Sequence, residues 1–462
     1  MATMRNELYE YEITPAVFLT GRQITLSLRS VNERRTLEAG HEYNVLINEF
    51  SRAEDSRFIG SGCTRALKVT AGDDHVLRIT AVFEREGMYQ IHVFYRENEG
   101  FLGEFRVYAL GDDMKGLYPY RGDFHMHSSR SDGNEDPFLV VSNYRETGYD
   151  FTIISDHGKY YPSLEARAKF KIAENDESPI TDMQVLTGEE IHLPLNDLHY
   201  ISCGSAFSVN ALVTPNSNQD YMGDDPRGRS ADGNCPPTMT REAFMEMITE
   251  RAKYVDRPIE SERLSFAAAE WIYEKVREGG GLGIFVHPYW MCSTVQVSEE
   301  YFDYLYGKKP FDAFEVLGGE NYFQQNGFQT IFYYEHKAKG MNYPIVGSTD
   351  SHGSTGRNRN SRICSTIVFA RQNKTEDIKD AVKKGYSVAI DTISPEYRVV
   401  GDFRLAKYGS FLMENWYPLH DRLCGPQGTY MREYVLGNPS AEGILKSLKG
   451  QVPALMSRFF EL

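Results

Sequence analysis

The stretch GDFHMHSSRSDG, residues 122–133, places two histidines one residue apart and an aspartate five residues after the second. Residues i and i+2 of an extended strand point to the same face, so His125 and His127 can contact one ion together. A chain with 12 histidines produces such a pair by chance often enough that the pair alone is weak evidence. Asp132 precedes a glycine and can equally stabilise the turn. The stretch therefore predicts a metal site only if later segments supply further ligands.

Later apolar runs end in the same way, in acids or histidines. These residues are Asp156 and His157 after TIIS, Glu189 and Glu190 after VLTG, His287 after GIFV, Glu315 within FEVL, and Asp350 and His352 after IVGST. The carboxyl ends of parallel strands meet at one end of a barrel, where active sites form. The repeated placement therefore predicts that these side chains converge.

The donor types indicate which ions such a site would bind. Imidazoles and carboxylates without thiolates suit Zn, Mn or Fe and do not choose among them. Asp350 and His352 repeat the i, i+2 spacing of the first histidine pair. The donors exceed what one ion can use, so the sequence predicts a cluster of two or three divalent metal ions. For Glu315, an ion pair with a lysine or arginine is the alternative.

Hydrophobic patterning divides the 462 residues into three regions. Residues 1–118 contain alternating runs, such as VLRITAVF at 76–83, that predict a small β-sandwich domain. Residues 119–395 alternate apolar runs with helical stretches, the pattern of parallel strands and crossover helices in a βα barrel or sheet. Helices are expected near 136–147, 241–255, 264–278, 321–339 and 375–384. Residues 396–462 are predicted to be a mostly helical extension, broken by Pro418, Gly425, Pro426, Gly437 and Pro439.

A long segment without periodicity lies near residues 201–241 and is rich in Gly, Pro, Asn, Asp and Ser. A loop of this length in a compact domain is usually functional or disordered. We interpret it as a lid-like insertion beside the site, with Tyr221, Arg227 or Arg229 reaching inward.

Charge and composition limit the partners. A formal net charge of −15 repels a phosphate backbone, so no stable nucleic-acid complex is expected, while a small anionic substrate stays possible. Six cysteines without a C-x-x-C indicate neither a thiolate zinc site nor a disulfide framework. The charged start MATMRNELYEYE lacks the apolar region of a signal peptide, and we identify no membrane span. We expect a cytoplasmic protein and leave its oligomeric state open.

Seven motifs together resemble the PHP (polymerase and histidinol phosphatase) family of metal-dependent phosphoesterases, in a branch with a β-rich N-terminal extension. They are D-F-H-x-H-S-x-x-S-D-G (123–133), I-S-D-H (154–157), G-E-E-I (188–191), L-H-Y (198–200), V-H-P (286–288), F-E-V (314–316) and G-S-T-D-S-H (347–352). The resemblance covers residues 119–395. It implies an α/β fold, a distorted (β/α)7 barrel with a trinuclear site at its mouth.

The resemblance also implies which residues hold the ions. The first ion would lie on His125, His127, Glu190 and Asp350, the second on Glu190, His199 and His287, and the third on Asp132, His157 and His352. The family has a single acid after the glycine, which favours Glu190 over Glu189. We expect Glu189 and Glu315 to contact ligand residues.

For the reaction, the resemblance implies hydrolysis of a small phosphate ester by a hydroxide that bridges two ions. Asp156 is a candidate to orient or deprotonate the attacking water. His192 is a candidate general acid, with a structural role as the alternative. Arg357, Arg359 and Arg362 follow the last ligand pair, and their guanidinium groups match a phosphate. A solvated loop is the alternative for these arginines.

Other functions fit the same residues. A carbamate, ester or amide hydrolase would use the same hydroxide to attack a carbonyl carbon. An oligonucleotide phosphodiesterase ranks lower, because no basic groove with aromatic stacking residues can be identified. A degenerate barrel that serves only as an interaction module would lack some ligands, and all nine are present.

Overall fold

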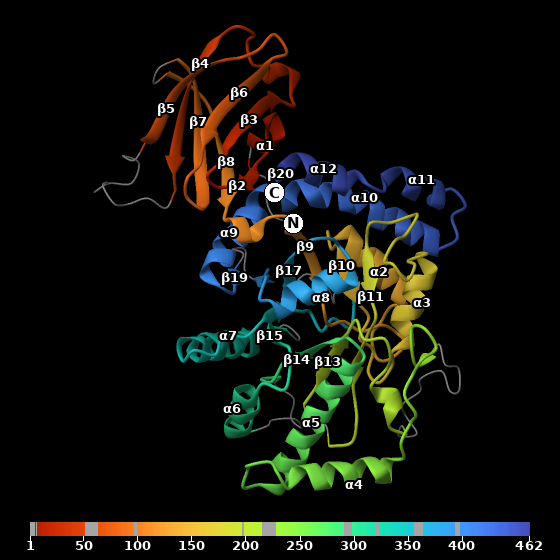
Figure 1. Cartoon of the computed structure of the whole chain (residues 1–462). Helices are drawn as coiled ribbons and strands as arrows, with labels where there is room; N and C mark the ends of the chain where they lie inside the picture. The colour runs from red at the N-terminus through yellow and green to blue at the C-terminus, as the bar shows by residue number, and fades with distance from the viewer. Residues whose placement is uncertain are drawn as a thin grey trace. The chain divides into compact units, whose positions relative to one another are not determined.

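The computed structural model describes residue 5 and residues 7–50, 63–96, 99–195, 198–214, 228–290, 298–318, 323–354, 364–392 and 398–462. Within these ranges the fold is mixed α/β with four sheets (Figure 1). The chain folds into two compact units. Unit 1 comprises Met1–Tyr118, Phe403–Leu423 and Gly450–Leu462, and unit 2 comprises Pro119–Asp402 and Cys424–Lys449.

Two sheets of unit 1 share one hydrophobic core. The first has the order β1 (Tyr11–Thr14), β3 (Gln23–Ser30), β6 (Val76–Val82). The second has the order β20 (Phe460–Glu461), β2 (Val17–Leu19), β8 (Glu99–Leu110), β7 (Gly87–Arg96), β4 (Glu42–Glu49), β5 (Cys63–Thr70). In β3, Ile24, Leu26 and Leu28 are buried and the residues between them are not, as period-two alternation predicts. Each such side chain stabilises the fold by about 1.5–3 kcal/mol.

Among the described residues, unit 1 contains the helices α1 (Glu7–Glu10), α9 (Phe403–Asn415) and α12 (Gln451–Phe459) and the start of α10 (Tyr417–Val435), up to Leu423. Helix α9 contacts β7 and β8. The aromatic rings of Tyr408 and Phe411 on α9 pack against Tyr108 of β8, with centroids 5.0 and 5.3 Å apart. The C-terminal helices thus supply part of this unit.

Unit 2 contains the other two sheets. One has the order β11 (Gln184–Leu186), β10 (Phe151–Ile153), β9 (Tyr118–Asp123), β17 (Cys364–Ala370), β18 (Ser387–Asp391), β19 (Arg398–Val400). The other has the order β12 (Gly188–Ile191), β13 (Tyr200–Cys203), β14 (Leu282–Phe285), β15 (Ala313–Leu317), β16 (Ile345–Gly347). Gly122 permits the close packing of β9 and β10, because a Cβ there would lie 2.3 Å from the Phe151 ring.

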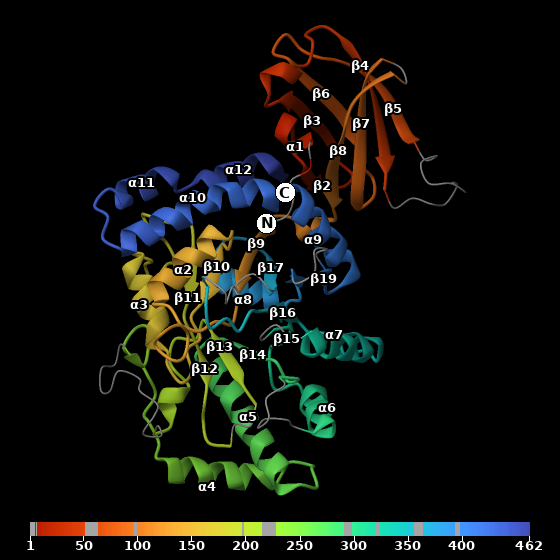
Figure 2. The same cartoon turned by 180° about the vertical axis from the view of Figure 1, so that it is seen from behind.

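Strand direction only partly follows the sequence expectation. β9, β10 and β11 are parallel, and so are β14, β15 and β16. The expected pattern of parallel strands holds for only part of unit 2, because β12 to β14 and β17 to β19 pair antiparallel. Residues 192–199 connect β12 to β13, a link that is shorter than a crossover between parallel strands, so the chain reverses direction there. Figure 2 shows β12, β13 and β14 as neighbours.

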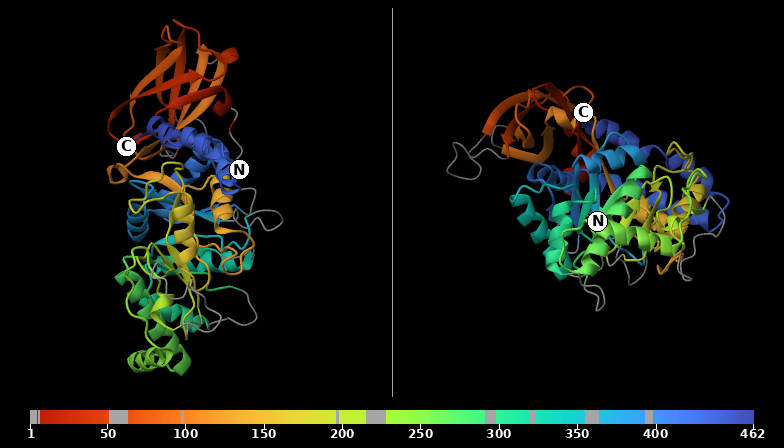
Figure 3. Two further views of the ribbon diagram at one scale, coloured as in Figure 1. Left: turned by 90° about the vertical axis from the view of Figure 1, so that its right-hand side faces the viewer. Right: turned by 60° about the horizontal axis from the view of Figure 1, so that its bottom comes forward.

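The helices of unit 2 include all five that the sequence predicted. These are α2 (Pro137–Glu146), α4 (Arg241–Ala252), α5 (Glu260–Glu278), α7 (Phe323–Ala338) and α8 (Thr375–Lys383). Helix α2 begins where Asp136 accepts a hydrogen bond from the Phe138 N–H and proline occupies the first turn. The structure adds α3 (Tyr161–Lys169), α6 (Glu299–Lys308) and α11 (Ala441–Leu448). Helices α4 and α5, green in Figure 3, pack together.

A predicted helix break does lie near Pro418, because α9 ends at Asn415 and α10 (Tyr417–Val435) begins two residues later. The predicted breaks at Gly425 and Pro426 are wrong, because α10 runs through both positions. Pro418 lies in the first turn, where its missing N–H has no partner to lose. Farther along this helix, a Cβ at Gly428 would lie 2.1 Å from the Glu146 backbone nitrogen, so this glycine permits close packing at the end of α2.

The described parts of the insertion are held at its base. Bridges join Phe207 to Ser230 and Val213 to Met239, so its two ends lie side by side. Arg229 donates to the Ala211 carbonyl and to Thr238 within this base. Tyr221 and Arg227 lie outside the described residues, and the role of the segment as a lid stays a prediction. No helix in the described ranges combines the length and the apolar character that crossing a bilayer needs.

Candidate metal centre

The candidate ligands lie at or near the ends of strands in unit 2, with Glu190 inside the short strand β12. β9 leads into His125 and His127, and β16 leads into Asp350. These segments pair through their backbones, because the His127 N–H donates to the Ser351 carbonyl and the Asp350 N–H donates to the His125 carbonyl, each over 2.8 Å. Backbone pairing thus joins two segments that are distant in sequence.

Two further segments join them. His157 and Glu190 form an isolated parallel bridge, and the Glu190 N–H donates to the Ser155 carbonyl over 3.1 Å. His199 precedes β13, which pairs with β12, and His287 follows β14, which pairs with β13 on its other side. Sheet pairing therefore carries the predicted ligands to one place.

The most buried part of the centre contains two imidazoles and two carboxylates. His125 Nε2 lies 3.2 Å from Asp350 Oδ1 and 3.6 Å from Glu190 Oε2. His127 Nε2 lies 3.0 Å and 3.3 Å from the same two oxygens. Nitrogen and oxygen donors at these separations face a common point, as one divalent cation requires.

The other oxygen of Glu190 extends the centre in a second direction. Glu190 Oε1 lies 2.6 Å from His199 Nδ1 and 3.9 Å from His287 Nε2. His287 Nε2 also lies 3.9 Å from Asp350 Oδ2. A carboxylate whose two oxygens face different imidazoles has the geometry to bridge two cations.

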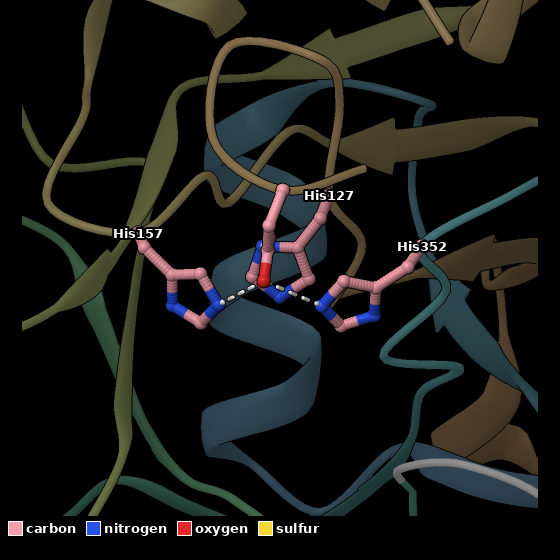
Figure 4. A group of neighbouring side chains, drawn as sticks. His127, His157 and His352 are labelled. Atoms are coloured by element: carbon pink, nitrogen blue, oxygen red, sulfur yellow. Dashed lines mark ion pairs between the residues drawn. The ribbon is translucent and has the colours of Figure 1, made fainter. Parts of the chain in front are cut away.

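Asp132 forms a third donor group with two histidines. Its Oδ2 lies 3.3 Å from His157 Nε2 and 3.3 Å from His352 Nε2 (Figure 4). Figure 4 also shows His127 between these two rings, and His127 Nδ1 lies 3.9 Å from Asp132 Oδ1. The Asp132 side chain is 53% exposed, whereas Glu190 is fully buried, so this group lies on the open side of the centre.

Two imidazole rings face two donor groups each. His127 turns Nε2 toward Asp350 and Nδ1 toward Asp132. His157 turns Nε2 toward Asp132 and Nδ1 toward Glu190, 2.7 Å away. The three predicted groups are therefore linked through shared rings.

Charge within the centre is strongly coupled. Burial disfavours the charged form of His157, but Glu190 and Asp132 outweigh it and raise its pKa to about 11. Burial likewise opposes ionisation of Asp350, yet the surrounding imidazoles, His125 first, hold its pKa well below the usual range. His287 is different, since burial lowers its pKa to about 3 and keeps the ring neutral. Ionised carboxylates beside imidazoles form a site that attracts positive charge.

Several buried polar atoms of the centre face other donor groups but form no hydrogen bond, as expected of metal ligands. Both carboxylate oxygens of Glu190, His127 Nδ1 and His287 Nε2 are buried and have no hydrogen bond among the described residues. Such atoms are rare in folded proteins, because an unsatisfied buried polar group costs about 1–3 kcal/mol. Metal coordination would satisfy all four atoms, so the residues present fit divalent ions.

The backbone carries strain at two of the ligands. His287 has φ of 23° and Asp350 has φ of 48°, in the left-handed region that residues with a Cβ rarely adopt. Such conformations cluster at functional sites, where the surrounding structure holds them. The strain thus lies at two candidate ligands that face each other, since His287 Nε2 lies 3.9 Å from Asp350 Oδ2 and also 3.9 Å from Glu190 Oε1.

Adjacent residues of β12 send their side chains to opposite faces. Glu190 enters the centre, whereas Glu189 accepts hydrogen bonds from the Ser208 hydroxyl at 2.6 Å and from the Asn210 side chain at 3.0 Å. Burial raises the pKa of Glu189, although these hydrogen bonds oppose the shift. Glu189 therefore holds the base of the insertion and contacts no predicted ligand through these bonds.

Glu315 lies behind the centre and contacts two ligands. Its Oε2 lies 3.3 Å from His125 Nδ1, and its Oε1 accepts a hydrogen bond from the His287 N–H at 3.1 Å. The pairing with a lysine or arginine that the sequence left open is not formed in the described structure. A carboxylate behind a histidine ligand fixes the ring and its tautomer.

The two predicted acid–base residues have different surroundings. Asp156 accepts hydrogen bonds from the Ser128 N–H at 2.8 Å and hydroxyl at 2.6 Å, and from the Ser131 N–H at 3.2 Å. These contacts favour a role in shaping the 128–131 turn over activation of water. His192 Nε2 lies 2.7 Å from His157 Nδ1 and 3.8 Å from Glu190 Oε2, so it belongs to the centre.

Three predicted arginines and one acid that was not predicted remain to be placed. Arg357, Arg359 and Arg362 lie outside the described residues. Sequence reasoning missed Asp123, which accepts hydrogen bonds from the His125 N–H at 3.1 Å and the Thr349 hydroxyl at 2.6 Å. Burial raises the pKa of Asp123 to about 7. The acid precedes the H-x-H pair by two residues, a signal that could have marked it as a support.

A groove of about 660 Å³ lies beside the centre. Trp290 lines it, and the Trp290 ring centroid lies 5.6 Å from that of His199 and 5.8 Å from that of His287. The other walls come from α6 and α7 and include four acids, Glu299, Glu300, Asp303 and Glu335, with one lysine, Lys339. The groove therefore combines aromatic faces with a negative rim.

Comparison with known proteins gives weak matches. No protein-family model and no curated protein matches the chain. A two-domain protein from Bacteroides vulgatus, containing a predicted PHP-like metal-dependent phosphoesterase, is 16% identical with a TM-score of 0.38. The match covers 60% of this chain and 65% of that protein, so this chain spans less than two thirds of it.

Two further solved structures are similar at the same level. An amidohydrolase from Chromobacterium violaceum is 15% identical with a TM-score of 0.30, over 51% of this chain and 89% of its own. The lesion-specific endonuclease PfuEndoQ from Pyrococcus furiosus is 14% identical with a TM-score of 0.34, over 58% of this chain and 56% of its own. At this level of similarity, function is inferred from the site itself.

Proposed function

We propose that the protein is a metal-dependent hydrolase of the PHP type that cleaves a small phosphate ester. The observation that carries this proposal is the arrangement around Glu190, whose two buried oxygens face imidazoles from four separate segments. The nine proposed ligands are His125, His127, Asp132, His157, Glu190, His199, His287, Asp350 and His352. Two or three Mn, Zn or Fe ions would bind there.

The same proposal includes the finer architecture. The strands of unit 2 within residues 119–395 would form the distorted (β/α)7 barrel, and the strands within residues 1–118 the small β-sandwich. Residues 396–462 would be the helical extension. The parallel strand sets β9 to β11 and β14 to β16, with ligands beyond their ends, support the barrel.

When bound, the ions would supply the Lewis acidity that ionises a water and neutralises charge on the substrate oxygens. Residues of the chain position this chemistry. Glu315 contacts the His125 ring at Nδ1, and Asp123 accepts a hydrogen bond from the His125 backbone N–H. Asp132, on the open side, would meet the incoming substrate first. His192, next to His157, is the candidate to donate a proton to the leaving group.

The groove beside Trp290 supports a small substrate over an oligonucleotide. Its four acids and one lysine give a net charge of −3 before histidine is counted, and such a rim repels a polyanion. A single phosphate at the centre would instead be neutralised by the ions. The uncharged or cationic remainder of the substrate would occupy the groove.

The proposal is tested with two neighbouring variants. Glu190→Gln removes the central carboxylate, whereas Glu189→Gln changes an equally buried acid that faces away from the centre. We expect wild type and Glu189→Gln to bind two or three ions per chain by elemental analysis and to hydrolyse p-nitrophenyl phosphate. Glu190→Gln should lose at least one ion and about 100-fold or more in kcat.

The outcomes separate the candidate reactions. Bis-(p-nitrophenyl) phosphate and an aryl carbamate are assayed in parallel with the monoester. Turnover of the carbamate alone would overturn the phosphoesterase assignment and leave a metal-dependent carbonyl hydrolase. Metal content well below one ion per chain at neutral pH would overturn the metal centre altogether.

A further inference from the structure

Unit 1 contains a cavity that has no part in the metal centre. Its volume is about 380 Å³, within the range of small-molecule sites, roughly 300–1,000 Å³. Its walls come from the N-terminal strands β1, β3 and β8 and from helices α1, α9, α10 and α12. The cavity therefore lies where the first and last segments of the chain meet inside unit 1.

The interior of this cavity is apolar. Tyr11, Ile13, Phe105, Leu455 and Phe459 line it, and each of these side chains is largely buried. Tyr11 and Phe105 meet edge to face, with ring centroids 5.6 Å apart. A hydrocarbon or aromatic body inserted here would leave water and be stabilised by burial.

The rim of the cavity is positively charged. Five arginines line it, Arg5, Arg29, Arg106, Arg422 and Arg458, with only three glutamates, Glu7, Glu12 and Glu104, a net charge of +2. The whole chain carries a net charge of −15, so this excess is local and opposite in sign. An anion would be attracted to this rim in spite of the charge of the chain.

The glutamates of the rim are already engaged. Glu12 accepts a hydrogen bond from Arg29 Nε at 2.6 Å, and Glu104 accepts one from Arg106 Nε at 2.9 Å. Arg422 has no ion pair among the described residues and lies over the Tyr9 ring, 4.8 Å from its centroid. Its guanidinium donors are thus available to a ligand.

Arg5 lines the same cavity, and its side chain is 19% exposed. Arg5 is paired with Glu104 at 3.3 Å, yet burial and the nearby Arg106 lower its pKa. A bound anion would offset this repulsion between arginines.

We propose that this cavity binds a small amphipathic anion. Its apolar body packs among Tyr11, Phe105 and Leu455, and its carboxylate contacts Arg422 at the rim. Fork-like guanidinium donors match the two oxygens of a carboxylate, which accounts for selectivity over a neutral head group of the same length.

Calorimetric titration of the full chain with four probes tests the proposal. Octanoate has both the body and the charge, octanol only the body, acetate only the charge, and octylamine the opposite charge. We expect saturable binding of one octanoate per chain, at least about tenfold tighter than octanol, and no saturation with acetate or octylamine.

Two exposed arginines provide the matched variants. Arg422→Gln should weaken octanoate about tenfold and leave octanol unchanged, whereas Arg22→Gln, exposed and outside the cavity, should change neither. Both substitutions are on the surface, so circular dichroism and thermal unfolding should match wild type. Equal affinity for octanoate and octanol, no effect of Arg422→Gln, or no saturable octanoate binding would each overturn the proposal.

Discussion

The variant Glu315→Gln tests how strongly the metal affinity of the candidate centre depends on the carboxylate behind His125. The two oxygens of Glu315 serve different ligands, the His125 ring at 3.3 Å and the His287 N–H at 3.1 Å. Glutamine has nearly the same shape but only one acceptor oxygen, so one of these contacts must lose its acceptor. The variant therefore disturbs the orientation of one ligand without removing a ligand.

The size of the effect follows from this contact. Losing a group that orients a metal-bound histidine typically lowers metal affinity by about 10–100-fold, which corresponds to about 1.4–2.7 kcal/mol. We expect Glu315→Gln to lose affinity within this range while its ion stoichiometry at saturation equals that of wild type. Competition with a chromophoric chelator, followed by absorbance, measures the affinity directly.

Glu189→Gln serves as the control for burial and charge. It removes an equally buried carboxylate that contacts Ser208 and Asn210 instead of the centre. Wild-type affinity in Glu315→Gln, or an equal loss in both variants, would refute the orienting role of Glu315.

Three further predictions concern packing, pH and metal removal. Gly428→Ala should lower Tm, because its Cβ would lie 2.1 Å from the Glu146 nitrogen, whereas Gly443→Ala in α11 meets nothing within 4 Å and should stabilise by about 0.5–1 kcal/mol. Burial opposes ionisation of Glu104, but Arg106 and Arg5 outweigh burial and lower the pKa of this carboxyl from 4.5. The ionised carboxylate therefore stabilises the fold above pH 4.5, and this contribution is lost as the pH falls below that value. Glu104→Gln should flatten this part of the curve of unfolding free energy against pH. Chelation should lower Tm of the metal-loaded protein by an amount that grows with the prior free-metal concentration, and an unchanged Tm would contradict tight binding to the folded state.

The convergence of the candidate ligands is what the sequence predicted best about this site. The ligand segments converge because backbone pairing brings strand ends together, a consequence of topology that local patterns already contain. Period-two alternation separates Glu189 from Glu190, but it does not say which of them faces inward. That choice depends on Ser208 and Asn210, whose side chains donate hydrogen bonds to Glu189.

The role of Asp156 and the continuity of helix α10 depend on tertiary contacts, which local sequence patterns do not contain. Asp156 follows a strand as the ligands do, yet the serines of the 128–131 turn occupy its carboxylate. Pro426 was expected to end a helix, but packing of the Gly428 region against α2 keeps α10 continuous. In both cases a distant segment outweighs the local preference of the residue.

The shared histidine rings would make the binding of one proposed ion depend on the binding of another. A neutral imidazole has a single lone pair, so His127 can serve the ion near Asp350 or the one near Asp132 through one nitrogen at a time. His157 faces the same choice between Glu190 and Asp132. Occupancy of one position therefore selects a tautomer that the next position inherits. Ion uptake should accordingly be stepwise and interdependent, and a binding isotherm of identical independent sites should fail to describe it.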